Sequence, residues 1–210
     1  MVETQYRQSY SVEVSTAPSV EPLTTAFAKL HMREDNSEQD NRIAMLITAA
    51  RIAAERETQR SLVTQTLKLR LDRFPNSREI VLPRPPLLTV TSIAYLDEDG
   101  ASQTFASTKY HTDITSQFGR VRLEPDESWP TTEYDRANAV TVTYTAGYGT
   151  TQWADSATPG SVPANIINGM LILVKHMYDQ PDLVKVGSSI QEVPRSIENN
   201  WSISRVHYGI

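Results

Sequence analysis

The sequence predicts an α+β fold, in which a small helical core carries an inserted antiparallel β unit and extended terminal arms. Two observations support this fold class. Apolar residues recur at helical spacing near 25–32, 38–57 and 164–179, whereas the stretch over about 62–146 alternates with a period of two. Because the β stretch lies between the second and third helices along the chain, we expect it to be an insertion into the helical core.

Residues 1–22 are predicted to form an N-terminal arm. A weak alternation from Tyr10 to Val14 is compatible with one strand, which Pro18 and Pro22 then interrupt. The apolar residues make up 39% of the chain, somewhat below the roughly 45–50% of typical domains. This modest apolar fraction is typical of a protein that has a hydrophobic core together with arms that are little buried within their own subunit.

The first two helices are predicted from capping residues and apolar spacing. Thr24 is a suitable N-cap for the helix over 25–32. Ser37 followed by Asp40 resembles a capping box, which predicts the start of the long helix over 38–57. The apolar stripe of this helix consists of Ile43, Leu46, Ile47, Ala50, Ala53 and Ala54. The charged residues expected largely off the stripe are Arg42, Arg51, Arg56 and Glu57.

The alternating stretch divides into short strands separated by turns. The strands are expected near 63–71, 79–82, 90–96, 102–106, 109–114, 119–123 and 140–145. Asp97 to Gly100 is a strong hairpin turn, because Asp and Gly tolerate positive φ. Pro83 to Pro86 lacks the amide donors of a ladder and is therefore expected at an edge or a crossing.

The helix over 164–179 is apolar nearly all round, so it must be covered on several sides. Pro163 precedes this helix and Pro181 ends it. Residues 181–210 are predicted to form an irregular C-terminal docking tail whose alternating end resembles a strand. The residues expected to contact a partner or a neighbouring subunit are Trp201, Ile203, Arg205, Val206 and Tyr208. The alternative is a tail that folds back over its own helices.

Composition excludes several classes of function. The 210 residues contain no cysteine, which excludes disulfides, thiolate nucleophiles and Cys-ligated metal sites. The formal net charge of −5 disfavours a general nucleic-acid binder, which needs a basic excess. The longest aliphatic run, from Met170 to Val174, is too short to span a bilayer. The N-terminal residues lack the basic and apolar regions of a signal peptide.

No constellation of residues predicts catalysis, so we expect neither an enzyme nor a cofactor or metal. His111 with Asp113, and His176 with Asp179, could each supply two metal ligands, but neither pair has a third ligand at a recognisable spacing. The segment Gly147-Tyr148-Gly149 lacks the lysine of a phosphate loop. The paired carboxylates in turn-like stretches, which are expected to bond their own backbone, are Asp97, Asp99, Glu124, Asp126 and Glu127.

Several segments, taken in their order along the chain, resemble those of a known protein family. They lie at 17–24, 28–33, 62–67, 71–75, 80–93 and 140–149, followed by the helix over 163–178. The strongest contains Pro83-Arg84-Pro85-Pro86-Leu87-Leu88. Together they resemble the head–tail connector family, also called neck adaptor or head-completion proteins, of long-tailed bacteriophages, prophages and gene-transfer particles. The resemblance covers about 17–180, whereas 1–16 and 187–210 match nothing in the family.

The resemblance implies a structural virion protein. Members form a ring, commonly of twelve copies, below the portal protein, where the ring extends the DNA channel and receives a stopper or tail-completion protein. The implied location is the neck of the virion, after assembly in the host cytoplasm, without catalysis or membrane contact. Twelve copies at −5 each would carry about −60, so the ring would let DNA slide past without specific binding.

The domain organisation expected from these observations has four parts. They are an N-terminal arm (1–22), a helical connector core (23–61 and 163–180), an inserted β subdomain (62–149) and the docking tail (181–210). Two other function classes stay open. A carbohydrate-binding or tail-decoration module would use exposed aromatic residues of the β subdomain, with candidates Tyr95, Tyr110, Trp129 and Tyr134. A metal-dependent hydrolase would use His111, Asp113 and His176.

Overall fold

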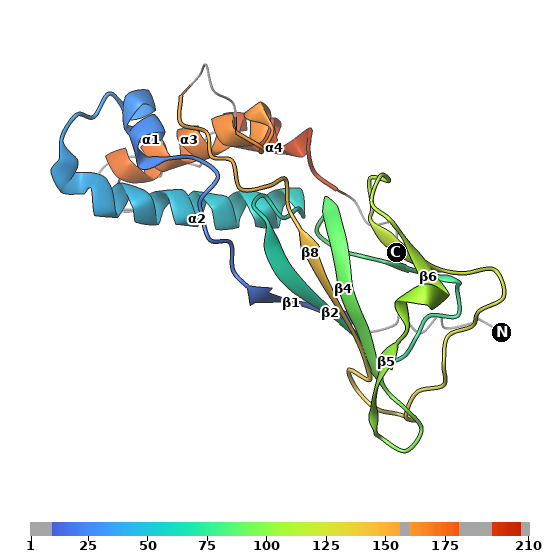
Figure 1. The fold of residues 1–210 in the computed structure, drawn as a ribbon. Helices are drawn as coiled ribbons and strands as arrows, with labels where there is room; N and C mark the ends of the chain where they lie inside the picture. Colours follow the sequence, from blue (N-terminus) through green and yellow to red (C-terminus); the bar gives the residue numbers. More distant parts are fainter. Residues whose placement is uncertain (1–9, 156–159, 181–194, 207–210) are drawn as a thin grey trace, which may run out of the picture. The chain divides into compact units, whose positions relative to one another are not determined.

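The computed structural model describes residues 10–155, 160–180 and 195–206 (Figure 1). The chain divides into two compact units. The first consists of 1–17 and 65–147, and the second of 18–64 and 148–210. Each unit has its own cluster of buried hydrophobic residues.

The first unit contains two antiparallel sheets (Figure 1). A five-stranded sheet has the order β1-β2-β8-β4-β5, and a three-stranded sheet has the order β3-β7-β6. The strands of the larger sheet are β1 (Tyr10–Thr16), β2 (Gln65–Leu71), β8 (Val140–Ala146), β4 (Leu87–Leu96) and β5 (Ser102–Phe105). Those of the smaller sheet are β3 (Glu79–Val81), β7 (Arg120–Leu123) and β6 (Tyr110–Asp113).

The strands expected from the period-two pattern are present, with shifted ends. β2 begins at Gln65 and β4 at Leu87, whereas the pattern indicated starts near Val63 and Val90. The strand expected in the N-terminal arm is β1, which pairs with β2 so that Tyr10 lies opposite Leu71. β1 is mostly exposed because it forms an edge of the sheet. Residues 10–16 of the predicted N-terminal arm are thus tied to the β unit through backbone hydrogen bonds, whereas its residues from 18 onward belong to the second unit.

Alternation along the strands places the core of the β unit. Every second residue of β2 and of β8 is buried, as expected for strands with one face against a core. The fully buried members of this cluster include Leu67, Leu69, Ile93, Val121, Val140, Val142 and Tyr144. The predicted turn from Asp97 to Gly100 is confirmed: Gly100 has a φ of 78°, and its N–H donates to the Asp97 carbonyl at 2.9 Å.

The second unit is helical. Its elements are α1 (Thr25–Met32), a 3-10 turn η1 (Ser37–Gln39), α2 (Asp40–Thr58), α3 (Ala164–Asp179) and α4 (Arg195–Ser202). Thr24 caps α1 as predicted, since its hydroxyl accepts the N–H of Phe27 at 3.1 Å. Within the described ranges, no helix combines the length and the apolar character that crossing a membrane requires.

The predicted capping box at Ser37 and Asp40 is wrong. The Asn36 side chain accepts the N–H of Glu38 at 2.9 Å, so it caps the 3-10 turn that leads into α2. Among the described residues, no side chain makes a capping hydrogen bond at the start of α2 itself. The chain therefore enters α2 through a tighter turn, and the helix begins at Asp40 rather than near 38.

The helices pack together around α3, although α2 and α3 lie far apart in the sequence. α3 contacts α1, α2 and α4, which covers the all-round apolar surface that the sequence shows. Small residues of α2, Ala50 and Ala54, are fully buried in this contact. The remaining fully buried residues of the cluster include Leu23, Ala28, Ile43, Ile47, Leu62, Ile166, Met170, Val174 and Ile197.

Candidate assembly surfaces

The described end of the chain corrects the predicted extended tail. Residues 195–202 form the helix α4, not a strand. Ile197 and Trp201 lie four residues apart on one face of α4, and both are buried in the helical core. A short helix buries these two apolar side chains within the subunit, whereas an extended strand would have left them for a partner.

Trp201 attaches α4 to α3. Its indole Nε1 donates a hydrogen bond to the Ile166 carbonyl at 3.1 Å. A Cβ atom built on Gly169 would lie 2.3 Å from the same Nε1, so only a glycine leaves room for the ring. Asn165 reinforces the contact, because its side-chain amide donates to the carbonyl of Asn200 at 2.9 Å. The tail is therefore folded over its own helices where it is described.

The other predicted interface residues fall into different environments. Val206 is buried, and its N–H donates to the Thr58 carbonyl at 3.0 Å. Arg205 is exposed and pairs with Glu57. Ile203 is exposed, and Tyr208 lies outside the described residues. Trp201 and Val206 thus belong to the core of their own unit, while Ile203 and Arg205 lie at the surface, where a partner has access to them.

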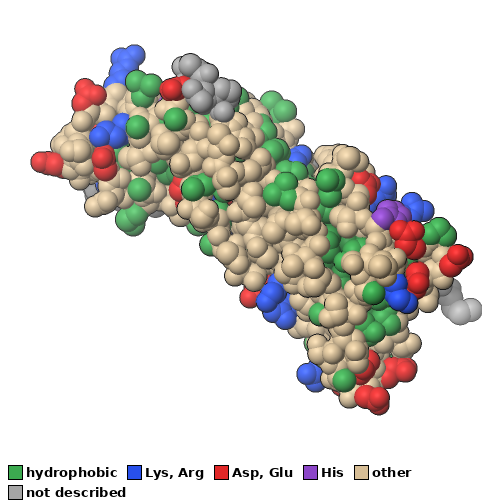
Figure 2. All heavy atoms as spheres, in the orientation of Figure 1, with side chains coloured by type: hydrophobic (Ala, Val, Ile, Leu, Met, Phe, Trp, Pro, Cys, Tyr) green, Lys and Arg blue, Asp and Glu red, His purple; other side chains and the backbone are tan. Residues whose placement is uncertain are grey.

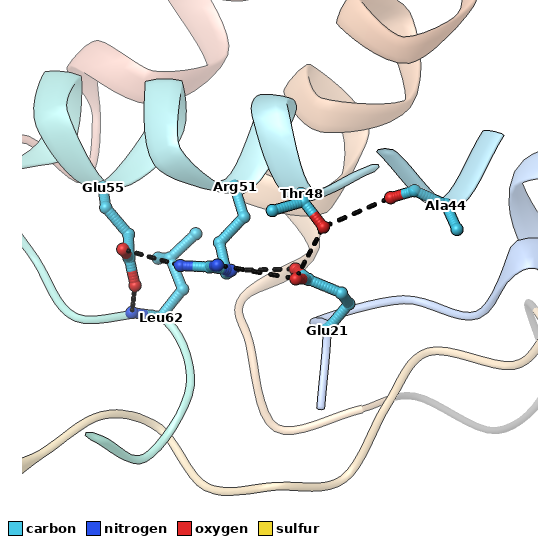
Figure 3. Close-up of polar contacts among 6 residues, drawn as sticks. All are labelled: Glu21, Ala44, Thr48, Arg51, Glu55 and Leu62. Atoms are coloured by element: carbon cyan, nitrogen blue, oxygen red, sulfur yellow. Dashed lines mark hydrogen bonds and ion pairs between the residues drawn. The ribbon is translucent and has the colours of Figure 1, made fainter. Parts of the chain in front are cut away.

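A buried ion network, which the sequence pattern missed, fixes the loops next to α2 (Figure 3). The Arg51 side chain is only 11% exposed and pairs with Glu21 at 2.8 Å and Glu55 at 3.2 Å. Glu55 also accepts the N–H of Leu62 at 3.0 Å, and Glu21 accepts the Thr48 hydroxyl at 2.9 Å. The network joins the segment before α1 and the segment after α2 to one side of α2.

The expectation that Arg51 lies off the buried side of α2 is therefore wrong. A guanidinium can be buried when carboxylates neutralise it and accept its hydrogen bonds. Arg51 and Glu55 stand four residues apart, which is the spacing of an ion pair on a helix. That spacing was the one sequence signal of the network, since nothing local indicates that Glu21 reaches the same site.

The candidate metal ligands make local ion pairs and hydrogen bonds. His111 Nδ1 lies 3.5 Å from Glu124 Oε1 on the exposed surface of the β unit. Asp179 pairs with Lys175 at 2.8 Å. His111 belongs to the first unit and His176 to the second. Across the part of the chain that the structure describes, no group of three or more His, Cys, Asp or Glu residues could hold a metal ion.

Asp113 is held in its ionised form by its own loop. Hydrogen bonds from Ser116 and Thr115 keep the pKa of the Asp113 carboxyl well below its ordinary value. Arg120 also donates to this carboxylate, at 3.1 Å. Through these hydrogen bonds, Asp113 stabilises the turn that follows β6.

We expect Asp113 to make the stability of the β unit depend on pH in acid. Its folded pKa is depressed, so its contribution is present above the unfolded value of about 3.9 and is lost as the pH falls through the folded value. Carboxyl NMR should show Asp113 titrating below the other aspartates. Asp113→Asn should remove the contribution near neutral pH and change little in strong acid. A midpoint at the ordinary value would contradict this assignment.

The carboxylates expected to bond their own backbone divide into two kinds. Asp97 does so, because it accepts the N–H groups of Asp99 and Ala101 at 3.2 and 2.8 Å. Glu127 instead pairs with Lys109 at 2.9 Å, and Glu124 with His111. Asp97 thus accepts turn amides, Glu127 pairs with a lysine and Glu124 lies beside His111, which is typical of a structural surface.

The aromatic residues considered for sugar binding do not form a shared platform. Trp129 stacks on Phe74 with ring centroids 4.9 Å apart, and Tyr95 meets the edge of Phe74 at 5.7 Å. Tyr110 is buried and stacks on Phe105. Of the four candidates, Tyr134 alone is almost fully exposed. The other three rings pack within the β unit and its hydrophobic cluster.

Comparisons with known proteins find similar solved structures but no similar sequence. Neither a scan of family models nor a search of curated proteins finds a match for the sequence. Among solved structures, a chain from the neck of an empty gene transfer agent (GTA) particle computed with C6 symmetry superposes with a TM-score of 0.75 and 18% sequence identity. This chain has the fold of a GTA neck protein. The match covers 95% of this chain and 97% of that chain.

Two further structures agree with this assignment of the fold. A chain from the virion of the native GTA particle gives a TM-score of 0.73 at 19% identity. A chain from the native GTA neck computed with C12 symmetry gives 0.68 at 18% identity. Both matches cover 95% of this chain and 97% of the other. The α+β fold implied by the family resemblance is thereby confirmed over nearly the whole chain, including its helical and β units.

Proposed function

We propose that this chain is a structural virion protein that forms an oligomeric ring in the neck, joins the capsid to the tail and extends the DNA channel. The observation that carries the proposal is the fold shared with GTA neck chains over 95% of this chain and 97% of those chains. A match of that extent involves the whole polypeptide rather than one reused domain.

A closed ring is supported by symmetry in the similar structures, two of which are necks computed with C6 and C12 symmetry. The proposed copy number is twelve. The proposed partners are the portal protein on the capsid side and a stopper or tail-completion protein on the tail side. Ile203 and Arg205 are the predicted interface residues that stay accessible for the portal or for a neighbouring subunit.

Surface charge fits a channel that DNA passes without being bound. The chain carries a net charge of −5. On the face drawn in Figure 2, basic side chains are dispersed among acidic ones rather than gathered into one patch. Phosphate backbones are gripped by clustered Lys and Arg, so a surface of this kind favours sliding over retention. The proposal assigns no catalytic, cofactor-binding or metal-binding role to any residue.

The purified chain tests this proposal, alone and mixed with the portal protein from the same genome. Mass photometry should find particles of about 280 kDa for twelve copies of 23.6 kDa, and electron microscopy should show rings attached to portals. EDTA should leave the rings intact. Monomers that do not bind the portal protein would contradict the proposal. Monomers that are retained on a glycan column would favour the carbohydrate-binding alternative.

A further inference from the structure

Helix α2 carries a second apolar face that is exposed among the described residues of its unit. Met45 is 73% exposed and Ile52 is 56% exposed. Ala49 is exposed between them, and the spacing of four and then three residues places all three on one side of the helix. The buried stripe, with Ile43 and Ile47 among its members, faces the other way. We call Met45, Ala49 and Ile52 the α2 face.

Helix α1 presents a similar but smaller surface. Leu30 is 67% exposed, and Ala26 is exposed one turn before it. The opposite side of α1 carries Ala28 and Met32, which are buried in the helical core with α2 and α3. We call Ala26 and Leu30 the α1 face.

The two faces are separate patches on different helices. α1 and α2 contact each other within the helical unit, and the buried residues of both helices belong to the same hydrophobic cluster. The outward side of each helix lies opposite its buried stripe. The α1 face and the α2 face are therefore two distinct outward patches of the same unit.

We propose that the α2 face of one copy packs against the α1 face of the next copy, and this inference rests on the proposed neck ring. A cyclic ring requires a head-to-tail contact between two different patches, whereas one self-complementary patch would stop at a dimer. The described part of the helical unit supplies two such apolar patches, the α1 face and the α2 face. Alanine on both faces permits the close approach that packing of two helices requires.

Charges at the ends of the two faces favour a second copy as the occupant. Arg33, three residues after Leu30, is an exposed cation at the end of the α1 face. Glu38, seven residues before Met45, is an exposed anion before the α2 face. An antiparallel contact between the two helices would bring Arg33 of one copy near Glu38 of the next. The same contact removes the exposed apolar side chains of both faces from water.

Cysteine cross-linking tests the contact directly, because the natural chain has no cysteine. Leu30→Cys and Met45→Cys place one thiol on each face, at exposed positions that the antiparallel contact would bring close together. With a short bis-maleimide, each single variant alone should stay uncross-linked. A mixture of the two should give covalent dimers, and the double variant should give a ladder of oligomers up to the size of the ring.

The outcomes separate this contact from the proposed function. Rings that form normally but yield no ladder would overturn the contact and leave the neck proposal standing. Covalent dimers from Met45→Cys alone would show that the α2 face pairs with itself, which also overturns it. A chain that forms no rings with or without the portal, and no ladder, would overturn both.

A charge substitution gives an independent measurement. Met45→Glu combined with Ile52→Glu should convert rings to monomers, because the contact would bury two carboxylates. The melting temperature of the monomer should stay unchanged, since both positions are exposed in the subunit. Ile52→Leu is the matched control and should retain the rings. Rings that survive the double glutamate variant would contradict the proposed contact.

Discussion

Replacing Trp201 with alanine should destabilise the helical unit by about 3–5 kcal/mol, the usual cost of deleting a buried aromatic side chain. The indole is buried against α3 and donates to the Ile166 carbonyl. Its removal leaves a cavity beside Gly169 and also loses that hydrogen bond. Urea denaturation followed by circular dichroism at the helical band measures the change.

Gly169 provides the matched test of the same contact. In the natural chain, Gly169→Ala should cost about 1–3 kcal/mol, because the new Cβ would overlap the Trp201 ring. In the Trp201→Ala background the same change should be neutral or stabilising, since alanine is the better helix former by about 1 kcal/mol. The two substitutions should therefore be strongly non-additive. Additive effects would show that α4 does not rest on Gly169 in solution.

Local patterns in the sequence predicted most of the secondary structure. The bounds expected for α1 and α3 agree with the observed helices, because Thr24 marks the start of α1 and because Pro163 and Pro181 flank α3. The turn at Asp97 agrees because Gly100 adopts the positive φ that its residue type permits. In these elements the information lies within a few residues of the structure that it specifies.

α4 was missed because two local patterns compete in one segment. Trp201, Ile203 and Arg205 alternate like a strand, whereas Ile197 and Trp201 have the spacing of a helix. The choice between them is made by Gly169, which provides the space for the indole on a helix far away in the sequence. This tertiary contact outweighs the strand-like alternation of the segment. It cannot be predicted from the residues of the segment alone.

The exposed face of α2 was also hidden from the sequence. A buried stripe of isoleucine and alanine identifies the core side of a helix, but Met45 and Ile52 then look like further apolar residues of the same helix. Only their exposure distinguishes a second face from a wider core. Similarly, burial of Arg51 depends on Glu21, which approaches from a separate segment.

Replacing Arg51 with methionine should destabilise the protein by about 3–5 kcal/mol, because it breaks a buried ion pair from one side. The Glu55 side chain is only 8% exposed and would lose its guanidinium partner while remaining charged. Methionine preserves much of the apolar volume of the arginine side chain. The loss of folding stability is therefore due to the unpaired charge rather than to a cavity. Chemical denaturation of the single variant near neutral pH gives the value.

Two further variants determine whether charge is the cause. Arg51→Met with Glu55→Gln should recover much of the lost stability, because the glutamine removes the stranded charge and its carbonyl can still accept the N–H of Leu62. Lys175→Met is the matched control, since it breaks an exposed pair with Asp179 and should cost less than about 1 kcal/mol. An Arg51→Met variant no less stable than Lys175→Met would show that the Glu21–Arg51–Glu55 network does not hold the loops to α2.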